Sequence, residues 1–365
     1  MRLRTPPDSG GSFGIKQGVF PYVILAAVAA RVSGRPVKWI EDRLEHLTAS
    51  VSATNRVTTL EAAVAADGRI TALCWDQLED CGAHLRAPEP ATLYRMHGNM
   101  TGAYAIENVA IRNRVVLTNK TPTGLNRGFG GPQIYFALER LVHKIADELG
   151  LDRLDVIRRN LVPAGTFPHR TATGGLLDSG DYQTALDRAC AEGGLKALRQ
   201  RREAARAEGR LYGIGYAAVV EPSVSNMGYI TTVLTPEERA KAGPKNGAQA
   251  VATVAIDPLG SVTVKVASVP QGQGHRTVLA QVVAERLGLA LEAVRVNTEL
   301  DTARDPWSIA SGNYASRFAP AVAGAAALAA DRIRARVATI AAGQLNITAD
   351  RVDFRAGKLL DRDNP

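Results

Sequence analysis

Residues 118–133 read TNKTPTGLNRGFGGPQ and give the strongest indication of both the fold and the functional site. A β-forming run at 109–117 precedes this stretch, and an amphipathic apolar pattern at 134–149 follows it. The sequence therefore predicts a strand, a glycine-rich loop and a helix in succession. Glycines let backbone N–H groups approach an anion closely, and a helix N-terminus adds a favourable dipole. Arg127 adds a planar fork of donors that suits an oxygen-rich group.

Two other stretches share this glycine-rich design. SGGSFGIK spans residues 9–16, and PQGQGH spans residues 270–275. A loop of small residues, SGNYASR at 311–317, precedes a long alanine-rich segment. Any one of these stretches alone is more often a tight turn than a ligand site. Three glycine-rich loops on one chain together predict a large polar, anionic ligand that is held from several sides.

The composition is that of a globular protein. The chain has 365 residues, of which 45% are hydrophobic and 22% charged, enough for two or more domains with real cores. No apolar run reaches the roughly 18 residues of a membrane span, and the longest candidates, 20–31 and 319–330, predict buried helices. The N-terminus, MRLRTPP, lacks the apolar core of a signal peptide. We therefore expect a cytoplasmic protein with no membrane span.

The charged and cysteine residues exclude several classes of site. The formal net charge is +8, but the densest basic cluster, at 199–210, contains acidic residues and no aromatic ones. A solvated helix face is favoured there over nucleic-acid binding. Cys74, Cys81 and Cys190 are widely spaced and form no CxxC pair, so we expect structural thiols. This pattern argues against a disulfide framework, a zinc site or an iron–sulfur cluster held by this chain.

Periodicity and turn residues predict two halves that each repeat the order strand, glycine-rich loop, helix. Residues 167–181 have no period, and we place the domain boundary there, which gives domains 1–180 and 181–365. Asp67-Gly68 predicts a hairpin turn. We expect helices at 21–31, 134–149, 154–160, 182–191, around Arg199, at 277–287 and after 317; strands at 37–40, 57–64, 69–76, 109–117, 212–220, 250–256, 261–269 and 294–299; and a loop at 235–249.

The loops, in this order, resemble those of the molybdopterin-binding large subunit of the xanthine dehydrogenase family of molybdenum hydroxylases. Residues 10–16 look like the family's GGGFGxK loop, with Ser12 in place of a glycine. Residues 119–133 look like its N-x-x-P…RGFGxPQ segment. Further matches lie at 158–161, 167–171, 272–274 (the GQG loop) and 311–317 (an SGTxxSR-type loop). The likeness covers nearly the whole chain.

This resemblance implies an α+β fold of two subdomains, in which mixed sheets are flanked by helices and cofactor loops converge between the subdomains. It implies a molybdenum–molybdopterin cofactor, with the cytosine dinucleotide form left open and with no protein ligand to the metal. Arg127 would lie near the metal, where it orients substrate or stabilises negative charge. Gln273 would hydrogen-bond near a molybdenum oxo group. The other residues implied at the cofactor are Gly11, Phe13, Gly14, Gly128, Phe129, Gly130, Gly272, Gly274, Ser311, Gly312, Ala315 and Ser316.

The implied reaction is oxidative hydroxylation of an aldehyde or N-heterocycle with oxygen from water. Electrons would leave through [2Fe-2S] and FAD cofactors on partner subunits, which implies a hetero-oligomer. Relatives that oxidise carbon monoxide carry a cysteine close to the arginine, whereas Gly128 follows Arg127 here, and this disfavours that substrate. Glu221, Ser223 and Asn226 are expected near the substrate pocket.

Two departures from the family pattern qualify this interpretation. The family's glutamate base lies in a Gly-Glu motif near the end of the subunit, and this chain ends at Pro365 before such a motif. It also begins at the first cofactor loop. We therefore expect the internal portion of a larger subunit, incomplete as a catalyst. The alternative is a non-catalytic cofactor-binding or assembly module from a split or truncated gene. For His275 we expect a surface or capping role.

Overall fold

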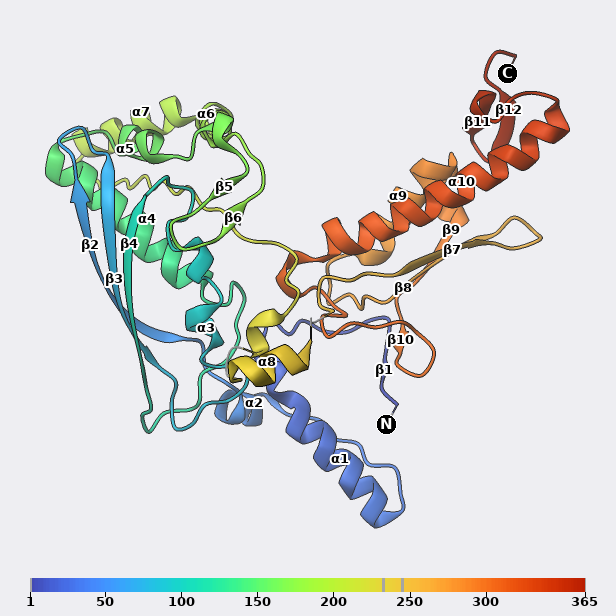
Figure 1. Ribbon diagram of the computed structural model, residues 1–365, viewed down its shortest axis with the longest axis horizontal. Helices are drawn as coiled ribbons and strands as arrows, with labels where there is room; N and C mark the ends of the chain where they lie inside the picture. The colour runs from blue at the N-terminus through green and yellow to red at the C-terminus, as the bar shows by residue number, and fades with distance from the viewer. Residues whose placement is uncertain (1, 232–233, 244–245, 365) are drawn as a thin grey trace. The chain divides into compact units, whose positions relative to one another are not determined.

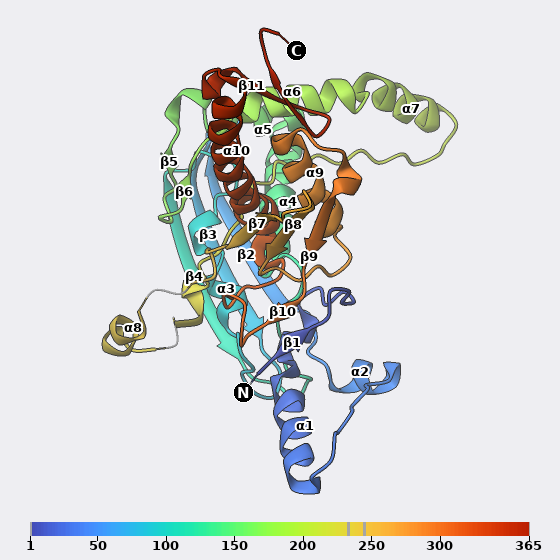
Figure 2. The same cartoon turned by 90° about the vertical axis from the view of Figure 1, so that its right-hand side faces the viewer.

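The computed structural model describes residues 2–231, 234–243 and 246–364 (Figures 1 and 2). The chain divides into two compact units. We name the unit Phe13–Glu221 the Arg127 unit, and the unit formed by Met1–Ser12 with Pro222–Pro365 the Gln273 unit.

The Arg127 unit is built on a three-stranded mixed sheet. Its strands are β2 (Asn55–Val64), β3 (Ile70–Asp80) and β4 (Asn108–Val116), in the order β2-β3-β4. Strands β2 and β3 form the antiparallel hairpin that the Asp-Gly turn predicts, and β4 pairs with β3 in parallel. Helix α4 (Gly131–Leu149) lies along one face of this sheet (Figure 1). Its apolar side packs with the inward residues of β3, including Trp75, in one hydrophobic core.

Three helices follow α4 in the Arg127 unit: α5 (Arg153–Asn160), α6 (Tyr182–Glu192) and α7 (Leu195–Ala207). Tyr182 and Leu186 of α6 and Leu195 of α7 pack against the core that α4 and α5 share. Residues 181–221 therefore belong to this compact unit. The compact units thus divide after Glu221, whereas the sequence led us to expect a domain boundary after residue 180.

Two strand predictions in this unit are wrong. Residues 212–220 form no strand, and Tyr216, Ala218 and Val220 pack against the core that contains α4 instead. There the backbone N–H of Ala218 donates to the Glu139 carboxylate at 3.0 Å, which replaces a ladder hydrogen bond. Residues 37–40 are also extended without a ladder partner in the described structure, and Trp39 stacks on Tyr22 with ring centroids 4.4 Å apart.

The Gln273 unit contains a second mixed sheet of the same pattern. Strands β7 (Ala252–Ile256) and β8 (Val262–Val266) form an antiparallel hairpin, and β9 (Val294–Asn297) pairs with β8 in parallel. The crossover from β8 to β9 contains the PQGQGH loop and helix α9 (His275–Leu287). Helix α10 (Gly324–Leu345) packs on α9 and on β7. Val264, Leu279 and Val283 are fully buried in the core between them.

The N-terminal residues belong to the Gln273 unit by strand pairing. Strand β1 (Arg4–Thr5) pairs with β10 (Leu300–Asp301), and Arg2 donates to the carboxylate of Asp301. The Arg2 guanidinium holds the pKa of the Asp301 carboxyl below its usual range. At the other end of the chain, β11 (Val352–Arg355) and β12 (Lys358–Asp361) form a hairpin.

The remaining elements are short or exposed. They are α1 (Phe20–Ser33), α2 (Arg43–Ala49), α3 (Ala91–Tyr94), α8 (Pro236–Ala242), β5 (His169–Arg170) and β6 (Leu176–Leu177). Helix α8 corrects the loop that we expected at 235–249, part of which lies outside the described residues. Thr235 and Glu238 form a capping box at its start, a signal that sequence reasoning overlooked.

Helix α1 presents an unusual surface. Its apolar side chains Ile24, Leu25 and Val32 are 56%, 63% and 82% exposed. Together with the preceding helical turn it forms a segment, Ile15–Ser33, of mean hydropathy 1.4, long and apolar enough by composition to cross a membrane. The sequence prediction of a buried helix at 20–31, and of no span-length segment, therefore differs from the structure. The segment is longer than the sequence led us to expect because the 3-10 turn Ile15–Val19, which contains Lys16, continues directly into α1.

The α+β class with mixed sheets and flanking helices is confirmed. Strands β2, β3, β4, β7, β8 and β9 and helices α4, α5, α6, α7, α9 and α10 all lie where the sequence predicts them, within a few residues at their ends. The parallel pairing of β4 with β3 and of β9 with β8 makes both sheets mixed.

Helix α4 offers a test of the core with an internal control. We expect Leu138→Ala to lower the free energy of unfolding by about 2–5 kcal/mol, because Leu138 is fully buried and its removal leaves a cavity. Phe136, on the same helix, is 71% exposed, and Phe136→Ala should change the free energy by less than about 1 kcal/mol. Urea unfolding followed by circular dichroism measures both. Equal losses would mean that α4 does not pack as described.

Candidate functional site

The RGFG loop of the Arg127 unit has a backbone that only glycine fits at two positions. Gly128 and Gly130 have φ of 90° and 88°, in the left-handed region. A Cβ atom at Gly130 would lie 2.1 Å from the carbonyl oxygen of Thr92. Gly130 is also the N-cap of α4, and no side chain caps this helix. In the first turn, the N–H of Gly131 donates to the carbonyl oxygen of Gly128 at 3.0 Å, and Pro132 has no N–H. Of the first three residues of α4, this leaves the N–H of Gln133 as a donor for a ligand.

Arg127 is exposed at the start of this loop and lies against Phe13. Its guanidinium carbon is 4.7 Å from the Phe13 ring centroid, which is cation–π geometry. Phe13 itself is 59% exposed and has a positive φ of 51°. Within the described part of the chain, no carboxylate pairs with Arg127. The structure thus brings together Phe13, its neighbour Gly14 and Arg127 and leaves guanidinium donors for a ligand.

Glu221 also lies beside the RGFG loop. Tyr135 donates its hydroxyl proton to Glu221 Oε2 at 2.8 Å, and Arg95 Nη1 lies 3.8 Å from Glu221 Oε1. The same Arg95 nitrogen donates to the carbonyl oxygens of Gly128 and Phe129 at 3.4 Å each. Sequence reasoning missed Arg95 and Tyr135. Tyr135 is four residues after Gly131 on the α4 face that meets the loop, which is a usable signal, whereas nothing local marks Arg95.

The PQGQGH loop of the Gln273 unit has open space around its glycines. Gly272 and Gly274 have φ of 96° and 75°, and no atom lies within 4 Å of a Cβ built on either. Gly274 is the N-cap of α9, again without a side-chain cap. The side-chain oxygen of Gln273 accepts from the backbone N–H of Gln271 at 2.6 Å. This loop can therefore admit a bulky anionic group against a helix N-terminus.

Hydrogen bonds join three predicted segments within the Gln273 unit. His275 Nε2 lies 2.6 Å from Asn313 Oδ1, which links the PQGQGH loop to the SGNYASR loop. Ser268 donates to the carbonyl oxygen of Gly312 at 3.0 Å. The backbone N–H of Val224 donates to the carbonyl oxygen of Ala315 at 2.8 Å, which adds the segment containing Ser223 and Asn226.

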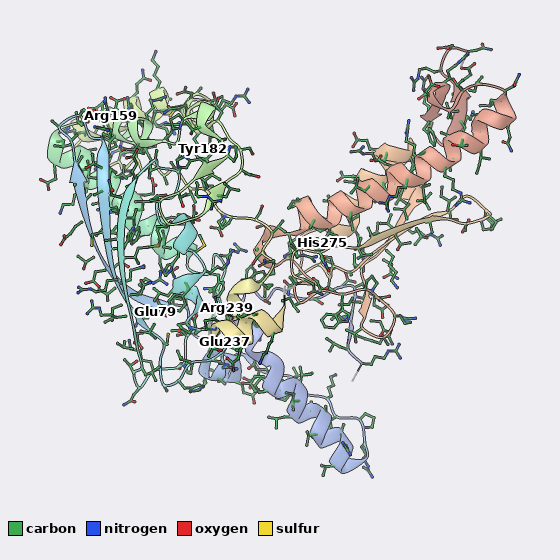
Figure 3. The ribbon with its side chains drawn as sticks, in the orientation of Figure 1. Glu79, Arg159, Tyr182, Glu237, Arg239 and His275 are labelled. Atoms are coloured by element: carbon green, nitrogen blue, oxygen red, sulfur yellow. The ribbon has the colours of Figure 1, made fainter. Side chains whose placement is uncertain are left out.

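His275 does not have the surface position that the sequence led us to expect. It is fully buried at the start of α9 (labelled in Figure 3), and its ring stacks on Phe318 with centroids 3.8 Å apart. Burial lowers the pKa of its imidazole, so the ring is neutral in the folded unit. The ring is buried because it lies against the Phe318 ring and the Asn313 side chain.

A buried arginine, Arg317, anchors the SGNYASR loop. Arg317 is 1% exposed and donates to the carbonyl oxygens of Ala310 and Gln249. Ala315 and Ser316 have positive φ of 50° and 53°. Gly312 has open space where a Cβ would stand, and Ser311 accepts from the N–H of Ser308 at 2.8 Å.

Gly11 belongs to the Gln273 unit, whereas Phe13 and Gly14 of the same loop belong to the Arg127 unit. Asp8, just before Gly11, pairs with Arg276 of α9 at 3.3 Å. The structure thus gathers the predicted residues into two sets, one in each unit.

No group of three His, Cys, Asp or Glu side chains within residues 2–231, 234–243 and 246–364 is arranged to hold a metal ion. Cys74 is exposed and Cys81 is buried, where burial raises the pKa of the Cys81 thiol to about 11. A thiol of that pKa stays protonated at neutral pH and is a poor metal ligand.

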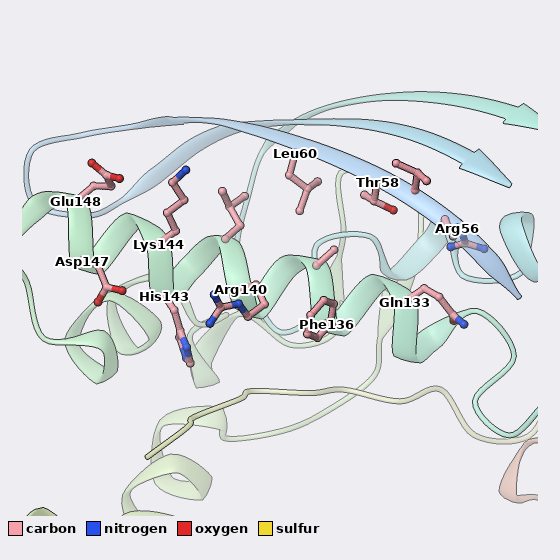
Figure 4. A pocket seen from close by; sticks show the side chains of 13 residues that line it. Arg56, Thr58, Leu60, Gln133, Phe136, Arg140, His143, Lys144, Asp147 and Glu148 are labelled. Carbon is pink, nitrogen blue, oxygen red and sulfur yellow. The ribbon is translucent and has the colours of Figure 1, made fainter. Parts of the chain in front are cut away.

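A separate groove of 710 Å³ lies between β2 and α4 of the Arg127 unit (Figure 4). At one end Arg56 pairs with the buried carboxylate of Glu79, whose pKa burial raises. Phe136 and Lys144 project from α4. None of the predicted site residues lines this groove.

Comparison with known proteins gives the family. Two models, each described as a molybdopterin cofactor-binding domain, match residues 1–161 and 188–364. The carbon monoxide dehydrogenase large chain of Hydrogenophaga pseudoflava is 32% identical over 96% of this chain and 43% of its own length. The nicotine 6-hydroxylase large subunit of Paenarthrobacter nicotinovorans is 32% identical over 93% of this chain and 40% of its own.

Among solved structures, quinoline 2-oxidoreductase from Pseudomonas putida 86 is similar with a TM-score of 0.83 and 31% identity. The match covers 99% of this chain and 44% of that chain. The chain therefore spans less than half the length of the relatives that it matches.

The buried state of His275 predicts a pH dependence of stability. Below about pH 6.5 the unfolded chain binds a proton at this imidazole, and the folded unit, in which the pKa is lowered, does not. Stability is therefore lost as the pH falls below that value. We expect His275→Asn to reduce the fall in Tm between pH 7.5 and 5.5, while His97 and His143, whose pKa values burial also lowers, keep their share. Differential scanning calorimetry measures it, with the exposed His84→Asn as control. An unchanged pH slope in His275→Asn would contradict the buried placement.

Proposed function

This chain belongs to the molybdopterin cofactor-binding domain family, and on that basis we propose that it forms the cofactor-binding portion of a molybdenum hydroxylase. The reaction proposed is oxidative hydroxylation of an aldehyde or N-heterocycle. The names of two relatives, a nicotine hydroxylase and a quinoline oxidoreductase, support an N-heterocycle. So does the sequence after Arg127, where glycine and phenylalanine stand in place of a cysteine.

One observation carries the proposal. In the Gln273 unit, hydrogen bonds tie the PQGQGH loop, the SGNYASR loop and the segment 223–226 into one cluster. Around this cluster Gly272, Gly274 and Gly312 leave open space, and the N-terminus of α9 has no side-chain cap. A pterin with its phosphate is an anionic group that suits such a cradle, since backbone N–H donors and the helix dipole both favour it.

The residues proposed to hold the cofactor are those of the two sets described above. Gln273 offers a side-chain amide, Ser311 and Ser316 offer hydroxyls, and the glycines offer backbone donors at close approach. When bound, the cofactor supplies the oxidation in which a substrate C–H becomes C–OH, with oxygen from water and with release of two electrons and two protons. Arg127 would supply a positive charge that stabilises negative charge developing on the reacting group.

We propose that the chain works in a hetero-oligomer, where iron–sulfur and FAD subunits accept the electrons, and in the cytoplasm. The relatives are named as large chains or subunits. The exposed apolar face of α1 supports contact with further polypeptide, because patches of this kind are rarely left in water.

Retention of the cofactor is the first test. The chain is purified from a host that makes the molybdenum cofactor, and bound pterin and molybdenum are measured by fluorescence after oxidation and by mass spectrometry. We expect about one pterin per chain, and at least about a tenfold loss in Gly272→Ala, because the new Cβ enters the proposed cradle. Gly260→Ala is the matched control: its φ of 82° is also positive and its Cβ also meets no atom, but it lies in the β7–β8 turn. Equal retention in both variants would overturn the cradle.

Turnover of the assembled enzyme tests Arg127. We expect Arg127→Ala to lower kcat with quinoline or benzaldehyde by about 100-fold, on the scale of losing one fixed electrostatic donor. Arg140→Ala, an exposed arginine on α4, is the control and should leave kcat unchanged. Unchanged kcat in Arg127→Ala would remove its proposed role. Full pterin retention without turnover in the wild type would favour the alternative, a non-catalytic cofactor-binding or assembly module.

A further inference from the structure

We propose that Glu221 is a positioning residue: its carboxylate holds Arg95 against the backbone carbonyls of the RGFG loop and so fixes the loop that carries Arg127. The consequence for the reaction rests on the proposed function, whereas the clamp itself rests on contacts within the Arg127 unit. We name Glu221, Arg95 and Tyr135 the loop clamp.

The first step is the contact of Arg95 with the loop. One of its terminal nitrogens donates to the carbonyl oxygens of Gly128 and Phe129, and the guanidinium carbon lies 5.6 Å from the Phe129 ring centroid. The Arg95 side chain is only 10% exposed. A guanidinium placed so deeply, with long hydrogen bonds to neutral carbonyls, needs a negative group nearby to offset the loss of hydration.

Glu221 supplies that negative group. Its Oε1 lies 3.8 Å from Arg95 Nη1, and its Oε2 accepts the hydroxyl of Tyr135 at 2.8 Å. One carboxylate oxygen thus faces the guanidinium of Arg95, and the other accepts a hydrogen bond from helix α4. Burial, together with the charge of Glu221, raises the pKa of the Tyr135 phenol, so the phenol keeps the proton that it donates.

A second anchor holds the carboxylate in place. Asn99 donates to the carbonyl oxygen of Val220 at 2.6 Å and to the Tyr135 hydroxyl at 2.9 Å. The backbone immediately before Glu221 and the hydroxyl that Glu221 accepts are therefore fixed by one amide group. The carboxylate, although 41% exposed, is oriented by its neighbours rather than by burial.

The loop needs such a clamp because its own backbone is strained. Phe129 has a positive φ of 39°, which costs on the order of 1 kcal/mol for a residue with a Cβ. Phe129 is only 4% exposed, so the residue with the strained backbone is also packed in the protein interior. Hydrogen bonds from Arg95 to the carbonyls on both sides of the Gly128–Phe129 link hold this conformation.

Gly131 gives a way to disturb the clamp without removing the carboxylate. A Cβ built on Gly131 would lie 2.9 Å from Glu221 Oε2 and 3.0 Å from the Tyr135 ring. Gly131 is the first residue of α4, so alanine there suits the helix. Gly131→Ala therefore displaces the carboxylate while it leaves the charge, the loop sequence and the helix intact.

Hydrogen–deuterium exchange of the 365-residue chain, measured on peptides that cover residues 124–133, tests the clamp directly. We expect exchange there to rise about three- to tenfold in Glu221→Ala and in Gly131→Ala, because the buried Arg95 loses the ion pair that offsets its lost hydration. Tyr135→Phe should give a smaller rise, because the pair with Arg95 remains. Glu61→Gln, an exposed carboxylate on β2 without a described partner, is the control and should change nothing.

A second measurement connects the clamp to the reaction. In the assembled enzyme, Glu221→Ala should lower kcat with quinoline by about tenfold or more with little change in KM and full pterin content. If loop exchange is unchanged in both Glu221→Ala and Gly131→Ala, the clamp is wrong, whatever the activity. If loop exchange rises but the wild-type chain binds no pterin, the clamp stands and the proposed function fails. If loop exchange rises and kcat does not fall, Glu221 has no positioning role in the reaction.

Discussion

In each unit a glycine in the left-handed conformation joins a loop to the helix that covers the sheet, and the rest of the site depends on this junction. Gly130 begins α4 and Gly274 begins α9, with φ of 88° and 75°. A glycine at this position has no side chain with which to cap the helix, and neither helix has a side-chain cap. In α4 the N–H of Gly131 donates to the carbonyl oxygen of Gly128 instead. The cofactor binding proposed for these loops therefore relies on backbone donors of α9 and of the loops, with Arg127 as the charged side chain.

The strand order of the two mixed sheets determines where these junctions lie. Each sheet is a hairpin whose second strand has a third strand beside it in parallel. A parallel neighbour requires a crossover, and in the Gln273 unit that crossover is the PQGQGH loop followed by α9. In the Arg127 unit the third strand instead ends in the segment that leads to the RGFG loop. In open sheets ligands bind at the carboxyl ends of strands, because the loops that reach helix N-termini gather there.

Local pattern was sufficient to predict most of the fold. The apolar period of α4, the Asp67-Gly68 turn and the hairpin at 252–266 each fix their own element. The failures have different causes. Helix α8 begins with a local capping signal that was overlooked, whereas the strand predicted at 212–220 fails for a tertiary reason. Residues 212–220 carry a strand-like pattern, but the N–H of Ala218 donates to the side chain of Glu139 and the carbonyl oxygen of Val220 accepts from the side chain of Asn99. Only tertiary structure decides that these groups have side-chain partners rather than a neighbouring strand.

In the candidate site, too, sequence patterns predict the features that depend on neighbouring residues and miss those that depend on tertiary contacts. Its glycine loops could be found by sequence, because each is a run of small residues next to a helix. Arg95 could not, because it reaches the RGFG loop from a distant position through side-chain contacts alone. Tyr135 follows that loop on α4 and Asn313 lies in the SGNYASR loop itself, but their partners Glu221 and His275 are distant in sequence. His275 was placed wrongly for a related reason: a histidine after a glycine loop gives no sign of the Phe318 ring that buries it.

Backbone strain supplies an argument for function that the loop motifs do not. Of the eight non-glycine residues with positive φ in the described structure, four are predicted cofactor residues: Phe13, Phe129, Ala315 and Ser316. Two more, Val224 and Met227, flank Asn226. A β-branched residue such as Val224 strongly disfavours this conformation, and each such position costs on the order of 1–3 kcal/mol. A chain under selection for stability alone has no reason to concentrate that cost in the loops that carry the predicted cofactor residues of each unit. The concentration follows if the loops must present particular backbone donors to a ligand, and the contacts made by Arg95 and Arg317 then act to hold a geometry that the backbone alone does not favour.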